Sequence, residues 1–282
     1  MKKYTSDEIA KMDYSRFVSL INERNRPSGG IKTVHTVAVN ALISSESKIL
    51  EIGSNTGFTS VNLSLLTGCS VIGIDINADS VKKADGYAQQ MGVKNKVQFV
   101  QASATKIPFD NDSFDAVWAS NVTSFIEDKE TALKEYLRVL KVGGVLIVVP
   151  IYYRKKVPMS IVNDVSVAIG VQIKEWTKSS WINFFTNIAD KTSMPLELFF
   201  EKDFEFDDRE ENIASYVDDV IDTNVFDGDL VNQKFFLKER FTYFMSLFNE
   251  NLKYAGFSIF LFQKRQKKDE KELFIAHETN KT

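Results

Sequence analysis

Short, mostly apolar runs alternate with longer amphipathic segments between residues 48 and 149. Such runs predict buried strands, and apolar residues that recur every three or four positions predict helices between them. Strands are expected at 49–52, 71–74, 97–100, 114–119 and 145–149. Apolar strands that alternate with helices are typical of a mostly parallel sheet covered on both faces, so this part of the chain predicts a doubly wound α/β fold.

The flanking segments have a different pattern. Before the first strand, helices are predicted at about 6–24 and 32–43, on either side of the helix-breaking run Arg26-Pro27-Ser28-Gly29-Gly30. The later part of the chain predicts, in order, a helix at 176–190, a strand at 196–206, helical sequence from about 209 to 254, and strands at 258–262 and 272–276.

These elements suggest a division of the chain into three parts. We assign an N-terminal helical extension to 1–31, a core to 32–206 and 253–282, and an inserted helical cap to 207–252. A single long insertion over 153–240 is the alternative division. In either case, an insertion after the last parallel strand can close over a ligand and exclude water.

Composition excludes several classes of partner. The 282 residues include 35 Lys and Arg against 38 Asp and Glu, and the resulting net charge of −3 argues against nucleic acid as the main partner. One cysteine, Cys69, excludes an internal disulfide and, with two histidines, leaves little material for a metal site, so no metal is expected. No apolar run is long enough to span a membrane, and the polar N-terminus does not resemble a signal peptide. We expect no membrane partner and a cytoplasmic location.

The segment that carries chemistry is Ile49-Leu50-Glu51-Ile52-Gly53-Ser54-Asn55-Thr56-Gly57-Phe58. An apolar strand runs into a turn with glycines at positions 53 and 57, and a helix follows at once. Open α/β sheets bind ligands at such turns, where glycine lets the chain bend sharply and a ligand approach closely. The spacing differs from a dinucleotide fingerprint, and the Glu51 carboxylate would repel a pyrophosphate, so a ligand with a positive charge fits better.

Three later strand ends supply further candidates. Asp75 ends the second strand, 22 residues after Gly53, where an acidic side chain can accept hydrogen bonds from both ribose hydroxyls. Ser103 and Ala104 follow the third strand and can line an adenine pocket, and Asn121 follows the fourth strand. The four strand ends together predict a site for one ligand that carries an adenosine and a cationic group.

The stretch from about 32 to 152 resembles the class I S-adenosylmethionine-dependent methyltransferases. In that family the first strand ends in an acidic-x-Gly-x-Gly-x-Gly motif, matched here by Glu51, Gly53 and Gly57. Asn55 stands in place of the middle glycine. Asparagine tolerates left-handed backbone better than most residues, so we expect the turn to be kept.

The resemblance implies S-adenosylmethionine as the cofactor and a role for each matching residue. Asp75 would bind the ribose and Ile76 would pack on the adenine, whereas Ser103 stands where the family usually has an aspartate. The implied architecture is a Rossmann-like, doubly wound, mostly parallel seven-stranded sheet with an antiparallel last strand and an inserted helical cap.

The expected activity is transfer of a methyl group to a small, partly apolar molecule by in-line displacement. Fifteen of the 22 phenylalanines lie between residues 176 and 262, which suits an apolar acceptor pocket as well as a hydrophobic core of the insertion itself. The alternatives are methylation of a protein or nucleic acid, a cofactor-binding but inactive partner subunit, and a site for another nucleotide. The sequence leaves the oligomeric state open.

Candidates for a general base are few. A base is needed only if the acceptor must lose a proton. Tyr152 and Tyr153 stand at the end of the fifth strand, near the expected methyl position, and His35 precedes the core. The simpler interpretations are an amphipathic wall for the two tyrosines and an ordinary helix residue for His35.

Overall fold

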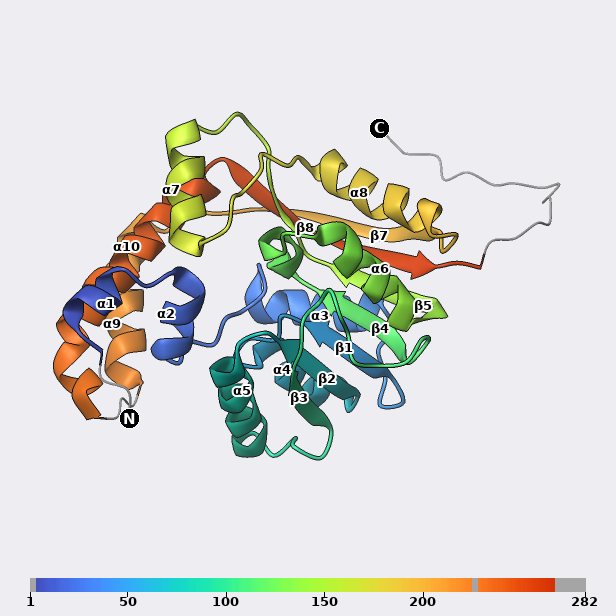
Figure 1. Ribbon diagram of the computed structural model, residues 1–282, viewed down its shortest axis with the longest axis horizontal. Coiled ribbons are helices and arrows are strands. Elements are labelled where there is room, and N and C mark those ends of the chain that lie inside the picture. Colours follow the sequence, from blue (N-terminus) through green and yellow to red (C-terminus); the bar gives the residue numbers. More distant parts are fainter. Residues whose placement is uncertain (1–3, 225–227, 267–282) are drawn as a thin grey trace.

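One sheet runs through the molecule and contains every strand that the structure describes (Figure 1). The computed structural model describes residues 4–224 and 228–266. The strands are β1 Lys48–Ile52, β2 Ser70–Asp75, β3 Val97–Gln101, β4 Phe114–Ala119, β5 Leu140–Val148, β6 Ile151–Tyr153, β7 Leu196–Glu205 and β8 Ala255–Lys264.

Helices connect and cover these strands. The α-helices are α1 Ser6–Ala10, α2 Tyr14–Leu20, α3 Gly30–Asn40, α4 Phe58–Thr67, α5 Ala78–Gln90, α6 Lys129–Val139, α7 Met159–Ile169, α8 Lys178–Lys191, α9 Ile213–Thr223 and α10 Lys234–Leu252. Short 3₁₀ helices lie at η1 Asn121–Phe125, η2 Glu210–Asn212 and η3 Gly228–Gln233.

The strand order confirms the expected sheet. Strands β3, β2, β1, β4 and β5 are parallel neighbours in that order, and β8 pairs with β5 in the antiparallel direction. The three-residue strand β6 continues the line of β5, because both pair with β8 along the same edge, whereas β7 pairs with the other edge of β8. The eight strands therefore occupy seven positions in the sheet.

Both faces of the sheet are buried, which explains the near-continuous apolar strands. In β8, Phe260 and Phe262 face a cluster that includes α6 and α8, whereas Ile259 and Leu261 face a cluster that includes α3, α4 and α5. Alternate residues of one strand point to opposite faces, so a strand covered on both sides must be apolar at nearly every position.

Two expected elements differ from the sequence prediction. The single helix expected at 6–24 is two helices, because Asp13 caps α2 by accepting a hydrogen bond from the Arg16 N–H at 2.9 Å. Strand β5 begins at Leu140 rather than Val145. Its pairing with β4 shifts register between Phe114 and Ala116, and this shift accommodates the glycines of β5. The expected strand at 272–276 lies outside the described residues.

Helices from three parts of the sequence form one group, which we call the helical subdomain: α1, α2, α7, α9 and α10. Their apolar faces share one buried cluster, formed by Ile9, Phe17, Ile21, Ala168, Val217, Ile221, Leu237, Phe241 and Phe244. Figure 1 shows this subdomain on the side of the sheet to which β1 and β4 point.

The boundaries 1–31, 32–206, 207–252 and 253–282 stay a prediction. The structure adds that α1, α2 and α7 pack with the two helices expected in the cap.

Among the described residues, no helix is both long enough and apolar enough to cross a membrane.

We expect Phe241→Ala to lower the free energy of unfolding by about 3–5 kcal/mol, because it leaves a cavity in the helical subdomain. Phe241 is 0% exposed, whereas Phe235 on the same helix is 66% exposed. Phe235→Ala is therefore the matched control and should change stability by less than about 0.5 kcal/mol. Urea unfolding measures both, and equal effects of the two substitutions would contradict the packing described here.

Candidate active site

The turn between β1 and α4 has an unusual backbone. Gly53, Asn55 and Gly57 all adopt the left-handed conformation, with φ of 69°, 44° and 87°. A Cβ added to Gly53 would lie 2.4 Å from Cγ2 of Val122, so no other residue fits there without displacing a neighbour. The expected turn is present, and Asn55 takes the left-handed position that it was expected to tolerate.

Hydrogen bonds tie this turn to the end of β2. The N–H groups of Gly53 and Ser54 donate to the Ile74 carbonyl at 2.8 and 2.9 Å. The carboxylate of Asp75 accepts the N–H of Asn55 and the N–H of Asn77, each at 2.9 Å. Burial raises the pKa of Asp75, and these backbone donors oppose the rise. The structure thus brings together the turn and the predicted ribose-binding acid.

The predicted adenine contacts follow the ends of β2 and β3. Ile76 is 73% exposed although it is apolar, and the side chain of Gln101 donates to its carbonyl at 3.1 Å. The hydroxyl of Ser103 lies 2.9 Å from that of Thr105, and Ala104 is buried. An exposed isoleucine beside a polar loop is a suitable surface for a planar ring, because covering it removes apolar area from water.

Asn121 lies at the start of η1, after β4. Its side-chain oxygen accepts hydrogen bonds from the Ser124 hydroxyl at 2.8 Å and from the Ile151 N–H at 3.3 Å. The next residue, Val122, is the one that contacts Gly53. Sequence reasoning did not select Val122, because an isolated valine in a loop gives no signal of a contact with a residue far along the chain.

Glu51 lies beneath the turn. Its carboxylate accepts hydrogen bonds from the N–H of Ser60, at 3.0 Å, and from the Ser60 hydroxyl, both in the first turns of α4. Burial raises the pKa of Glu51 to about 7, an effect that the bonds from Ser60 and Thr59 oppose and the charge of Asp75 adds to. The side chain therefore holds α4 against β1. Because its carboxylate is bonded to Ser60, Glu51 would act on a cationic ligand through its electrostatic field and not through direct contact.

The two candidate tyrosines have different hydrogen-bond partners, and His35 lies on another element. Tyr152 is 6% exposed, and its hydroxyl lies 2.9 Å from that of Ser258, which donates to Asp203 on β7. The Tyr153 hydroxyl donates to the Asn251 side chain on α10 at 2.7 Å. His35 lies on the exposed side of α3. Burial raises the pKa of both tyrosines, so each phenol stays protonated at neutral pH.

The N-terminal segment also reaches the turn, which the sequence did not indicate. The Thr56 hydroxyl donates to the Glu23 carbonyl at 3.0 Å, and the Lys83 ammonium on α5 donates to the carbonyls of Ser19 and Leu20. No local pattern predicts these contacts, because the partners are separated by 33 residues or more.

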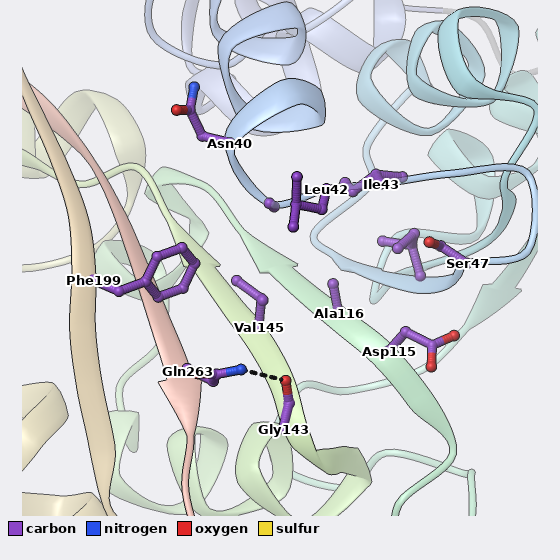
Figure 2. A pocket seen from close by; sticks show the side chains of 12 residues that line it. Asn40, Leu42, Ile43, Ser47, Asp115, Ala116, Gly143, Val145, Phe199 and Gln263 are labelled. Carbon is purple, nitrogen blue, oxygen red and sulfur yellow. Dashed lines mark hydrogen bonds between the residues drawn. The ribbon is translucent and has the colours of Figure 1, made fainter.

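A surface pocket of about 310 Å³ lies at the opposite end of the sheet (Figure 2). It is lined by Leu42 after α3, by Ala116 on β4, by Val145 on β5 and by Phe199 on β7. Because the turn follows the carboxyl end of β1, this pocket is not part of the site described above. Among the described residues, no cluster of three or more His, Cys, Asp or Glu side chains is arranged to hold a metal.

We expect Glu51→Gln to raise the free energy of unfolding at pH 8 and to flatten its dependence on pH between about 4.5 and 7. The folded pKa is raised, so the stability contributed by this carboxyl is full below the unfolded pKa and is lost as the pH rises through about 7. The loss is at most about 3 kcal/mol, since one pKa unit corresponds to about 1.4 kcal/mol.

Urea unfolding of both proteins at pH 5 and pH 8 measures this difference. Glu46→Gln, at an exposed carboxyl in the loop before β1, is the control. A Glu51→Gln protein that is less stable than the parent at pH 8 would contradict the interpretation.

Comparison with known proteins agrees with this geometry. Residues 50–148 match the family model described as a methyltransferase domain. An uncharacterized protein of Haemophilus influenzae is 29% identical over 171 residues, which cover 60% of this chain and 68% of that protein. The sterol 24-C-methyltransferase ERG6B of Gibberella zeae is 37% identical over 111 residues, which cover 39% of this chain but only 29% of the enzyme.

The solved structures extend the similarity to nearly the whole fold. The crystal structure of the MccD protein superposes with a TM-score of 0.69 and 25% identity, and the alignment covers 86% of this chain and all of that one. The family match, the strand order and the turn after β1 lead to one conclusion. Residues 50–148 form a methyltransferase domain with the fold of the class I S-adenosylmethionine-dependent enzymes, and S-adenosylmethionine is its cofactor.

Proposed function

We propose that the protein transfers a methyl group from S-adenosylmethionine to a small, partly apolar molecule. The observation that carries the proposal is the turn at 53–57, held by the Asp75 carboxylate and placed beside the exposed Ile76. An acid, an apolar surface and a glycine turn at adjacent strand ends suit the sugar, base and amino-acid parts of this cofactor.

Each residue predicted to bind the cofactor receives a role in this proposal. Gly53, Asn55 and Gly57 shape the backbone along which the amino-acid part lies, and Asp75 accepts hydrogen bonds from the ribose. The adenine packs on Ile76, with Ser103 and Ala104 along its edge.

The remaining residues surround the turn. Asn121 and Val122 form the wall beyond it, and Glu51 orients α4 from below.

S-adenosylmethionine supplies a methyl group that its sulfonium has already activated. The task of the protein is therefore to align the acceptor with that methyl group, and orientation of this kind contributes roughly 7–11 kcal/mol to catalysis. The helical subdomain lies opposite the strand ends (Figure 1), where it can exclude water and hold the acceptor. We assign no general base, because the hydroxyls of Tyr152 and Tyr153 are both engaged within the protein.

A partly apolar acceptor is supported by a named relative and by the charge of the chain. A relative that matches the core is named a sterol 24-C-methyltransferase, and sterols are largely apolar molecules. The net charge of −3 favours such an acceptor over nucleic acid.

Asp75→Ala is expected to weaken binding of S-adenosylhomocysteine by about 1–3 kcal/mol, because hydrogen bonds to the ribose are lost. Isothermal titration calorimetry gives the dissociation constants. Asp79→Ala, at an exposed acid in the first turn of α5, is the matched control and should leave affinity unchanged. An unchanged dissociation constant for Asp75→Ala would refute the assigned role.

Turnover is tested by incubating the full chain with S-adenosylmethionine and a panel of sterols, terpenoid alcohols, phenols and amines. We expect S-adenosylhomocysteine and a methylated small molecule, both measured by mass spectrometry. Turnover only with protein or nucleic acid would contradict the acceptor class. Cofactor binding without turnover, together with activation of a second enzyme, would contradict the catalytic role itself.

A further inference from the structure

We propose that the surface pocket between α3 and β7 binds a segment of the same chain, the apolar run Leu273-Phe274-Ile275-Ala276. The pocket has a volume of about 310 Å³ and lies at the end of the sheet opposite the turn at 53–57. The inference goes beyond the proposed function and does not depend on the cofactor. The apolar run itself lies outside the described residues.

Leu42, on one side of the pocket, stands where glycine is usual. Helix α3 ends with a hydrogen bond from the Ile43 N–H to the Ala38 carbonyl at 3.0 Å and one from the Leu42 N–H to the Val39 carbonyl at 3.3 Å. This pair of bonds is typical of a helix end whose last residue has left-handed backbone, and Leu42 has a φ of 52°. That conformation is unfavourable for a leucine, because its Cβ lies too close to the following carbonyl oxygen.

The rest of the protein uses other residues for this backbone. Gly68, Gly92 and Gly170 take it at the ends of α4, α5 and α7. Among the described residues other than glycine, all those with positive φ are polar except Leu42. The Leu42 side chain is also 85% exposed. A leucine that is unfavourable in both respects indicates a contact beyond the described residues, since covering it would remove apolar area from water.

Phe199 faces the pocket from another side. It is an extra residue in β7, because its neighbours Leu198 and Phe200 pair with consecutive residues of β8. Such a bulge changes the direction of a side chain. Phe199 is 44% exposed, and Figure 2 shows it across the pocket from Leu42, with Val145 between them. Two separate irregularities of the backbone therefore place apolar side chains around one pocket.

The path of the chain indicates which segment covers this pocket. Gln263, near the end of β8, lines the pocket, and its side chain donates to the Gly143 carbonyl at 3.0 Å. The described chain continues from there only to residue 266. The next residues therefore start close to the rim of the pocket. The six residues 267–272 can span up to about 20 Å when extended, which is enough for the chain to turn back to it.

Residues 273–276 have the composition that the pocket requires. They are the only apolar residues between 267 and 282. Phenylalanine and branched side chains suit a floor made by the short side chains of Ala116 and Val145. A segment tethered beside its pocket also has a high effective concentration there, so it competes well against a second copy of the chain or another molecule.

The first test joins the two partners by a disulfide. In Leu42→Cys/Phe274→Cys, oxidation of the full chain with copper phenanthroline should form a bond within one chain, identified by digestion and mass spectrometry. Cys69 is 0% exposed and should not react. The matched control is Met159→Cys/Phe274→Cys, at an exposed residue of α7. We expect a roughly tenfold lower yield from the control, because the Cα atoms in a disulfide must lie within about 7 Å.

Each other outcome would overturn the inference. Equal yields in the two proteins would show that the segment reaches many surfaces. A bond between two chains, seen as a dimer in non-reducing electrophoresis, would assign the pocket to a second copy. Absence of any bond would show that the run does not reach Leu42. Neither this test nor the next uses the cofactor, so their failure leaves the proposed function unaffected.

The second test distinguishes a covered leucine from an uncovered one by scanning fluorimetry. Asparagine tolerates left-handed backbone, so Leu42→Asn should raise the unfolding temperature of a protein in which Leu42 lies in water. We expect it to lower that temperature by about 2–4 °C in the full chain, because the contact is lost, and to lose this effect in the Phe274→Ser background. His277→Ser, at a polar position beside the run, is the control background. A rise with Leu42→Asn in the full chain would contradict the inference.

Discussion

The hydrogen bond from the Asn55 N–H to the Asp75 carboxylate joins the first two strands at the point where the chain turns most sharply. It holds a left-handed residue in place at 2.9 Å, and the same carboxylate binds the start of the next helix through Asn77. One side chain therefore sets the position of two loops. The same two loops carry the exposed Ile76 and Gly53, which lies against Val122.

The helical subdomain gives the site its second side. Its core combines residues near the N-terminus with residues beyond position 213, and Phe17 contacts both Phe241 and Phe244 on α10. Helix α7, from the middle of the chain, packs into the same cluster through Ala168. Under the proposed function, the helices that would hold the acceptor therefore lie outside the matched domain.

The sequence predicted the core well and the periphery less well, for physical reasons. Strands such as 114–119 are buried on both faces, so their position is encoded in consecutive residues. The turn was predictable because left-handed backbone restricts the choice of residue at Gly53 and Gly57. The break between α1 and α2 was missed because Asp13 caps the second helix without interrupting the apolar spacing. The contact between Glu23 and Tyr216 leaves no local pattern, and the direction of the Glu51 carboxylate depends on Ser60, which no motif marks.

The position of β8 between β5 and β7 has a consequence for how the protein acquires its structure. Residues 255–264 form the strand between β5 and the edge strand β7, so a ribosome must release them before β7 can join the strands made earlier. Until then α1 and α2 also lack the α10 surface on which they pack. Contacts between such distant parts of a chain form slowly and leave apolar surface uncovered in the meantime. The nascent chain therefore carries an unfinished sheet, in which the edge of β5 has no partner, until residues 255–264 have been made.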